Sequence, residues 1–357
     1  MDFFVENAMK EAEAFTTDEM MAGQANITVI GTGGAGNNMV DWLYTKGVSG
    51  AKIIAVNTDL QHLNTLSVDN KYLIGKDLTR GLGCGGFPEK GAEAAKENLN
   101  ELKESLKGSD MVFVCAGLGG GTGTGAAPVV AKLAHEMGAI VIGTVTMPFE
   151  IERARIDKAE FGLQKLRNVC DTVICIDNNR LVQIAGNLPV RQAFEVANEL
   201  IATMIKGIVE TIAVPSLVNL DFADVRAVMT NGDVAAIGVG ASDTSNRVED
   251  AVRSALTNPL LDINYDGATG AIIQITGGED MTLEEVTRVG NIITKTMSED
   301  ATVIWGARID ENMNGKLTVM TIITGVSSPW IVGKKQEEQR NTNMKRKFSE
   351  ELELEMI

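Results

Sequence analysis

The segment that decides the fold is Gly117–Pro128, with the sequence GLGGGTGTGAAP. It follows the apolar run Met111–Ala116, which predicts a β-strand, and leads into Thr124–Met137, whose apolar spacing predicts a helix. Six of the nine residues 117–125 are glycine, which would cost much conformational entropy in a loop that bound nothing. Glycines let a backbone approach a phosphate closely, and the following helix offers free N–H groups. The segment therefore predicts a phosphate-binding loop.

A second glycine loop, Gly31–Gly36 (GTGGAG), follows the apolar run Ile27–Ile30 and precedes another predicted helix. Its pattern matches G-x-G-x-x-G, a weak signal that dinucleotide-binding dehydrogenases share. Asp59 lies 23 residues after Gly36, where such an enzyme places an acidic residue on a ribose. Two such loops at the carboxyl ends of two strands would converge on one polyphosphate. The sequence contains no G-x-x-x-x-G-K-[ST], which excludes a P-loop NTPase.

Strand and helix signals alternate along the first half of the chain, and the strands are continuous apolar runs, as in a parallel sheet covered on both faces. We predict an α/β fold in which a doubly wound parallel-sheet nucleotide-binding domain (25–188) is joined by a long central helix (189–215) to a smaller α+β domain (216–325). An acidic arm (1–24) precedes this body, and a charged linker and tail peptide (326–357) follow it. Predicted strands are Ile27–Ile30, Ile53–Val56, Met111–Ala116, Ile140–Val145, Thr172–Ile176, Val234–Val239, Ala271–Thr276, Thr302–Ala307 and Lys316–Thr324. Predicted helices include Pro88–Leu106, Arg153–Arg167, Asn246–Thr257 and Leu283–Met297.

Charge and composition restrict the partners. The chain has 357 residues, with 32 Lys and Arg against 48 Asp and Glu, so the net charge is −16. This charge argues against a nucleic-acid partner but not against an anion held by neutral backbone amides. With four cysteines, no CxxC pair and two histidines, we predict no metal site built from the protein alone. No apolar stretch reaches the ~20 residues that a membrane helix needs, so we expect a cytoplasmic protein without direct membrane insertion.

Four motifs together resemble the tubulin/FtsZ family, and FtsZ more than tubulin, which is longer. They are GGGTGTG at 119–125, NTD at 57–59, GLGCGG at 81–86 and NLDFADV at 219–225, in the FtsZ order and spacing. The resemblance implies a self-assembling GTPase with GTP/GDP and Mg²⁺ as cofactors. It implies a head-to-tail homopolymer that forms the division ring at the division site. It also implies a tail peptide that binds a membrane-anchoring adaptor.

The resemblance assigns binding roles to particular residues. The α- and β-phosphates would be lined by Gly33, Gly34, Ala35, Gly36, Asn37 and Asn38. The β- and γ-phosphates would be held by Gly119, Gly120, Gly121, Thr122, Gly123 and Thr124, with Cys84, Gly85 and Gly86 sensing the γ-phosphate. Asn57 and Asp59 would serve the ribose and magnesium side, and Asn178 the nucleoside. Phe194 would stack on guanine, and Asn198, where many relatives have Asp, would contact the base edge.

One segment departs from the family pattern. The chain has Pro148–Arg155 (PFEIERAR), one residue shorter than the PFxFEGxxR of relatives. Arg155 matches the arginine, but the ribose-contacting acid could be Glu152 or Glu150, and we favour Glu152. This departure and Asn198 favour a divergent, archaeal branch.

Asp221 and Asp224 lie three apart, which places both on one face of a helix start. On spacing alone, Asp221 as a helix N-cap and Asp224 as a first-turn acid explain the pair. The resemblance makes Asn219, Asp221 and Asp224 a catalytic loop that orients a water for attack on a γ-phosphate. A helix of ~20 residues spans ~30 Å, so the pair would not reach the nucleotide of its own chain. We therefore predict catalysis in trans, at a head-to-tail contact.

Two alternatives remain open. An NAD-dependent oxidoreductase would use Gly31–Gly36, but it leaves the second glycine loop and residues 219–224 unexplained. A tubulin-family filament for cell shape or segregation would share every motif with a division protein. Retention of both aspartates favours nucleotide turnover over a static scaffold.

Overall fold

The computed structural model describes residues 25–213, 217–218, 220–230, 235–257, 263–295 and 297–326. The predicted arm, nearly all of the predicted tail and Asn219 lie outside the described residues.

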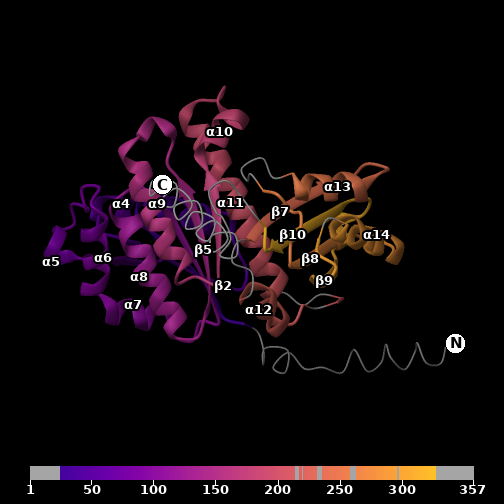
Figure 1. The fold of residues 1–357 in the computed structure, drawn as a ribbon, viewed down its shortest axis with the longest axis horizontal. Coiled ribbons are helices and arrows are strands. Elements are labelled where there is room, and N and C mark those ends of the chain that lie inside the picture. Colours follow the sequence, from indigo (N-terminus) through magenta and orange to yellow (C-terminus); the bar gives the residue numbers. More distant parts are fainter. Residues whose placement is uncertain are drawn as a thin grey trace, which may run out of the picture.

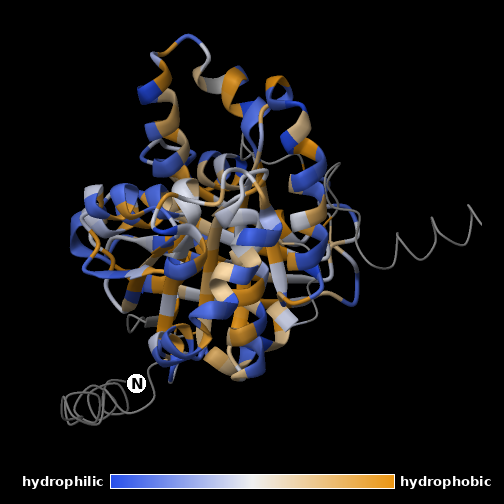
Figure 2. Ribbon diagram, turned by 90° about the vertical axis from the view of Figure 1, so that its left-hand side faces the viewer, coloured by the Kyte–Doolittle hydropathy of each residue, from blue (hydrophilic) through white to orange (hydrophobic). Residues whose placement is uncertain are grey.

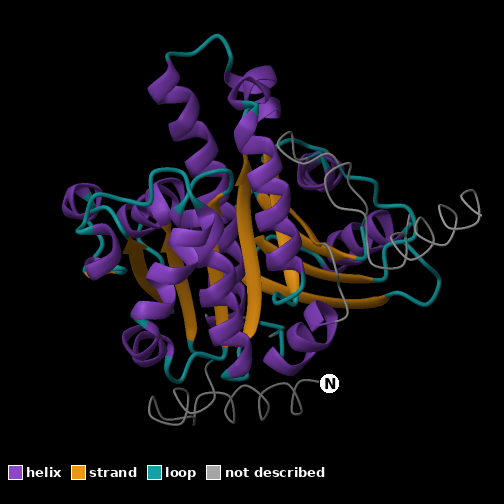
Figure 3. Ribbon diagram, turned by 60° about the vertical axis from the view of Figure 1, so that its left-hand side comes forward, coloured by secondary structure: helices purple, strands orange, loops and turns teal. Residues whose placement is uncertain are grey.

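The larger sheet has six parallel strands in the order β3-β2-β1-β4-β5-β6. Five of these strands were predicted, and the edge strand β3 was not, because NKYL is short and half polar. The strands are β1 (Ile27–Thr32), β2 (Ala51–Asn57), β3 (Asn70–Leu73), β4 (Met111–Gly117), β5 (Ile140–Met147) and β6 (Thr172–Asp177). Figures 1 and 3 show the strands of the molecule among the helices that surround them.

Helices cover both faces of this sheet, which is why its strands are continuously apolar. Ile30 and Val114 face one buried cluster, whereas their neighbours Val29 and Phe113 face another on the opposite side. Figure 2 shows hydrophilic and hydrophobic residues mixed along the helices around the sheet. The helices are α3 (Gly33–Lys46), α4 (Leu60–Thr65), α5 (Lys76–Thr79), α6 (Pro88–Glu97), α7 (Leu99–Leu106), α8 (Thr122–Glu136), α9 (Ala154–Arg167) and α10 (Asn178–Ala185), with a 3₁₀ turn at Glu150–Glu152.

The predicted single helix Pro88–Leu106 is two helices, α6 and α7, separated at Asn98. The side chain of Asn98 explains the break. Its Oδ1 accepts a hydrogen bond from the Gly75 backbone N at 2.9 Å, and its Nδ2 donates to Glu101 at 3.0 Å. The prediction was wrong here because the Gly75 contact comes from a segment 23 residues away.

The central helix α11 (Val190–Ala213) leads to α12 (Phe222–Thr230) and a smaller sheet in the order β7-β10-β8-β9 (Figure 1). Strand β10 is antiparallel to β7 and β8, and β8 is parallel to β9. The chain thus has the predicted doubly wound domain, central helix and smaller α+β domain. Its elements are β7 (Ala235–Ser242), α13 (Arg247–Leu256), β8 (Gly270–Gly277), α14 (Leu283–Thr294), β9 (Thr302–Ile309), a 3₁₀ turn (Glu311–Met313) and β10 (Leu317–Thr324).

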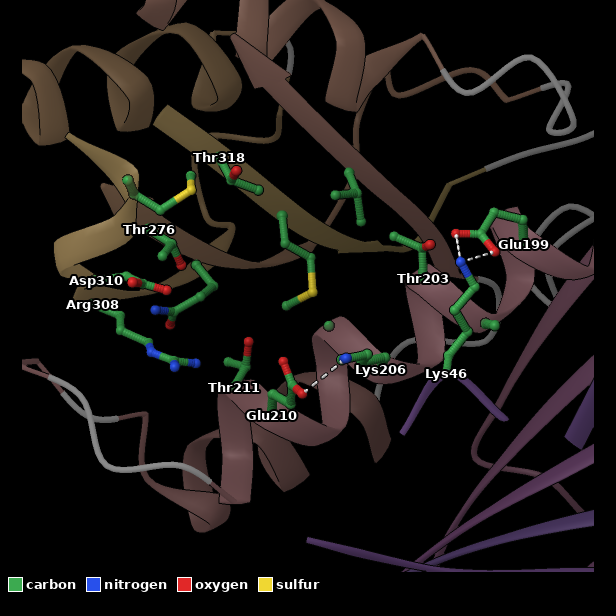
Figure 4. A pocket seen from close by; sticks show the side chains of 16 residues that line it. Lys46, Glu199, Thr203, Lys206, Glu210, Thr211, Thr276, Arg308, Asp310 and Thr318 are labelled. Atoms are coloured by element: carbon green, nitrogen blue, oxygen red, sulfur yellow. Dashed lines mark hydrogen bonds and ion pairs between the residues drawn. The ribbon is translucent and has the colours of Figure 1, made fainter. Parts of the chain in front are cut away.

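Helix α11 is tied to the larger domain by Glu199. Its carboxylate accepts hydrogen bonds from Trp42 Nε1 at 2.7 Å and from Lys46 Nζ at 3.0 Å, and these bonds lower the pKa of Glu199. Glu199 and Lys46 also line a cavity of about 400 Å³ between α11 and the smaller sheet, together with Lys206 and Glu210 from α11 and Arg308 and Thr318 from the sheet (Figure 4). None of the predicted nucleotide-binding residues lines this cavity.

Candidate functional site

A pocket of about 480 Å³ opens at the carboxyl edge of the larger sheet. The loops after β1 and β4 both contribute to it, and these strands are neighbours. The strand order reverses between β1 and β4, so the pocket occupies the switch point at which open α/β sheets bind ligands. Dinucleotide-binding folds share this strand order, so the topology alone leaves the ligand class open.

The glycines of the two loops have two different tasks. A Cβ on Gly36 would lie 2.2 Å from the Cys115 carbonyl oxygen, and one on Gly125 would lie 1.9 Å from that of Pro88. These glycines let α3 and α8 pack against their neighbours. A Cβ on Gly34 or Gly120, by contrast, would meet no atom within 4 Å, and both glycines line the pocket. Gly34 and Gly120 therefore leave open the space that a phosphate would take.

The loop after β2 is joined to the second glycine loop. Thr58 Oγ1 lies 2.7 Å from Thr122 Oγ1 and 3.4 Å from Cys84 Sγ, and all three groups are buried. Asp59 caps α4 by accepting from the His62 backbone N at 3.1 Å, and it lines the pocket. Three segments that the sequence predicts to lie beside the nucleotide are thus joined to one another.

His62 lies in the pocket wall although the sequence analysis did not single it out. Its Nε2 lies 3.1 Å from Asn38 Oδ1, and its Nδ1 lies 3.3 Å from Asn57 Nδ2. These partners fit the neutral tautomer with the proton on Nε2. The signal was available, because His62 follows the NTD motif by three residues.

The far end of the pocket is aromatic. Phe194 on α11 is 43 % exposed, and its ring meets Phe149 edge-on with centroids 5.9 Å apart. Glu152 lines the pocket, forms an ion pair with Arg155 and accepts from the Phe149 backbone N at 3.0 Å. Glu150 is not among the lining residues. An exposed aromatic face beside a phosphate-type loop suits a flat base.

Most of the predicted binding residues line this one pocket: Gly34, Ala35, Asn57, Asp59, Cys84, Gly86, Gly120, Gly121, Thr122, Gly123, Glu152, Arg155, Asn178 and Phe194. Residues that line it without having been assigned a role are His62, Gly83, Gly117, Leu118, Thr146, Pro148 and Phe149. Predicted residues outside its lining are Gly33, Gly36, Asn37, Asn38, Gly85, Gly119, Thr124 and Asn198.

Two of the predicted residues outside the pocket lining, Asn37 and Thr124, have side chains that hydrogen-bond the backbone of the protein. The buried side chain of Asn37 bonds the backbone of Val56 on β2 twice, as donor and as acceptor, each at 3.2 Å. Thr124 Oγ1 accepts from the Gly119 backbone N at 2.9 Å, which closes the second glycine loop. Both side chains therefore hold the loops in place.

Asp221 and Asp224 lie at the opposite edge of the larger sheet from the pocket. Both are exposed at the start of α12, and Asp221 Oδ1 caps this helix by accepting from the Ala223 backbone N at 2.9 Å. Helix α12 packs at the amino ends of β5 and β6, where Arg226 donates to the Gly138 carbonyl and Thr172 Oγ1 to that of Met229. The 24 residues of α11 span about 36 Å between the two edges. The pair therefore cannot reach the pocket of its own chain.

The described residues contain no group of three or more His, Cys, Asp and Glu that could form a metal cage. Mg²⁺ does not require one, because it binds through one or two carboxylates, waters and substrate phosphates. Asp59 and Glu152 are the carboxylates in the pocket lining.

A parallel sheet with two glycine loops at its switch point, followed by a central helix and a second sheet, defines a nucleotide-binding protein of the tubulin class. Comparison with known proteins identifies the family within this class. Residues 26–186 match the GTPase domain of the Tubulin/FtsZ family, and residues 233–327 match the C-terminal domain of the FtsZ family.

Individual relatives agree. Cell division protein FtsZ 2 of Methanocaldococcus jannaschii is 58 % identical over 89 % of this chain and 84 % of that protein. An FtsZ dimer from M. jannaschii superimposes with a TM-score of 0.80 at 48 % identity, covering 86 % of this chain and 90 % of that one. CetZ2 from Haloferax volcanii, solved as a GTPγS-bound protofilament, superimposes with a TM-score of 0.72 at 25 % identity. The match covers 91 % of this chain and 99 % of CetZ2. The chain belongs to the FtsZ family and is a GTPase, with archaeal relatives as predicted.

Proposed function

We propose that this GTPase assembles head to tail into filaments, and that each subunit supplies Asp221 and Asp224 to the nucleotide of its neighbour. One observation carries the proposal: the pocket and the exposed aspartates lie at opposite edges of the same sheet. A contact that joins one edge to the other is head-to-tail, and it generates an open filament when its rotation does not close a ring. The related FtsZ dimer from M. jannaschii and the CetZ2 protofilament from Haloferax volcanii support self-association of this kind.

GTP hydrolysis then takes place at the contact between two subunits. In hydrolysis a water oxygen bonds to the γ-phosphorus, the bond from this phosphorus to the bridging oxygen of GDP breaks, and inorganic phosphate leaves as H₂PO₄⁻ with both protons of the water. The amides around Gly34 and Gly120 hold the phosphates, and the neighbour's carboxylates orient the water. Mg²⁺ bound beside Asp59 would neutralise charge on the phosphates.

We further propose that Phe194 stacks on guanine, that Asn178 contacts the nucleoside and that Glu152 contacts the ribose. A stacked base contributes about 1–3 kcal/mol when the aromatic ring is truncated to alanine. We therefore expect Phe194→Ala to raise the Kd for GTP about 5- to 150-fold, and Phe194→Tyr to preserve it. Fluorescent GTP titration of the unassembled protein measures both variants, and equal affinities for them would contradict the stacking role.

The assembly proposal is tested by light scattering and phosphate release recorded together. Addition of GTP with Mg²⁺ is expected to raise both signals, whereas GDP is expected to raise neither. Phosphate release that is strictly first order in protein concentration, without scattering, would show that single subunits hydrolyse GTP. NADH serves as the control ligand, because the family membership removes the oxidoreductase alternative.

The place of the filament in the cell is inferred from the relatives of the chain. The identity of 58 % to a cell division protein favours a cytoplasmic filament at the division site over one for cell shape or segregation. No helix among the described residues is long and apolar enough to cross a membrane. We propose that an adaptor attaches the filament to the membrane by binding the tail peptide Phe348–Ile357.

A further inference from the structure

A second groove, of about 660 Å³, crosses the outer face of the larger domain between α6–α7, α8 and α9. Its floor is partly apolar, with Leu99, Pro128 and Val129 among the lining residues. It lies apart from the nucleotide pocket and shares no lining residue with it. Neither hydrolysis nor the proposed filament contact uses it.

Four lysines border this groove: Lys96, Lys103, Lys132 and Lys165. Glu136 is the one acidic residue in the lining, and it pairs with Lys132 at 3.7 Å. Within the described part of the chain, Lys96 and Lys103 form no ion pair, and Lys165 lies over the ring of Phe161. In a protein with a net charge of −16, this groove is a locally basic surface in which Lys96 and Lys103 have no anionic partner among the described residues.

The chain itself contains a segment with the complementary chemistry. Residues 348–357, FSEELELEMI, carry four glutamates and no basic residue. Phe348, Leu352 and Met356 are spaced by four, which places them on one face of a helix. A helix this short is marginal in water unless its apolar face is covered. Helix-in-groove recognition uses apolar anchors at this spacing and charged residues at the rim.

The length of the chain permits the contact within one molecule. The last described residue is Val326, so 21 residues separate it from Phe348. Fully extended, they reach about 70 Å. A compact body of some 300 residues has a radius of gyration of only about 19 Å. A tether of this kind supplies an effective concentration near the millimolar range, so a weak contact is sufficient.

We propose that Phe348–Ile357 docks in this groove of its own subunit, with its glutamates against Lys96, Lys103 and Lys165 and its apolar face on the floor. Docking covers the apolar anchors of the tail peptide, so the docked tail is closed to a second protein. Because exposed charge pairs are screened by salt, the contact weakens as ionic strength rises.

The test uses the full chain in GDP, with Phe348 replaced by the photo-reactive p-benzoyl-phenylalanine. We expect illumination to give a product of monomer size whose yield is independent of protein concentration. Its cross-linked peptide should map to α6–α9. Lys96→Glu with Lys103→Glu should lower the yield at least fivefold, and 0.5 M salt should lower it similarly.

A charge swap separates docking from misfolding. Glu351→Lys with Glu355→Lys leaves the folded body untouched and should lower the yield as much as the groove variant does. Combining the two pairs should restore at least half of it. The control pair Lys76→Glu with Lys316→Glu changes two exposed lysines outside the groove and should have no effect. Cross-links spread over the body, products of dimer size only, or a yield unchanged by either reversal would each overturn the proposal.

Discussion

Asp224→Ala is expected to leave GTP binding within about twofold and to lower phosphate release by about 100-fold or more. The first expectation follows because Asp224 lies at the opposite edge of the sheet from the pocket. The second follows because a residue that positions the attacking water contributes about 10²–10⁴-fold. The fold should survive, since the capping bond of α12 comes from Asp221 and the exposed side chain of Asp224 makes no hydrogen bond within the described structure.

Loss of activity alone would not show that catalysis occurs in trans, but a mixture of two inactive variants would. A subunit with Gly34→Ala and Gly120→Ala keeps Asp224 and is designed to lose the nucleotide. An Asp224→Ala subunit keeps the nucleotide and lacks the carboxylate. At their contact, the first supplies Asp224 to the GTP of the second, so phosphate release should reappear only on mixing. A mixture as inactive as its components, yet still assembling, would refute the proposal.

The sequence was sufficient for the architecture because its strongest signals are local. Apolar strands followed at once by glycine-rich turns specify a parallel sheet and the edge at which a ligand binds, without any knowledge of distant contacts. The same locality explains why 14 of the predicted binding residues line one pocket.

The features that the sequence did not predict depend on contacts between residues that lie far apart in the chain. The side chain of Asn37, which we predict to lie beside the phosphates, uses both of its polar atoms to hydrogen-bond the backbone of Val56, 19 residues away. Asn98 interrupts a good helical pattern for a contact with Gly75. Phe149 enters the pocket wall beside Phe194, from a different part of the chain. No local pattern contains such partners, so the folded chain was needed to show them.

Alanine substitutions at the loop glycines should separate two effects, a loss of folding stability and a loss of GTP binding, because different glycines serve packing and the pocket. Gly125→Ala should lower stability by about 3 kcal/mol, because the new methyl group would lie 1.9 Å from the Pro88 carbonyl oxygen and force α8 away from α6. At about 2–4 °C per kcal/mol, the thermal midpoint should fall by about 6–12 °C. Gly36→Ala, against the Cys115 carbonyl at 2.2 Å, should act similarly.

Gly120→Ala should behave in the opposite way. Its methyl group meets no protein atom within 4 Å and projects into the pocket, where we propose that the phosphates bind. We expect the thermal midpoint without nucleotide to shift by less than about 2 °C, and the Kd for GTP to rise at least tenfold. Differential scanning fluorimetry with and without GTP measures both quantities on one sample. A Gly120→Ala protein that is stabilised by GTP as strongly as the wild type would place the phosphates elsewhere, because a bound γ- or β-phosphate and that methyl group cannot share the same volume.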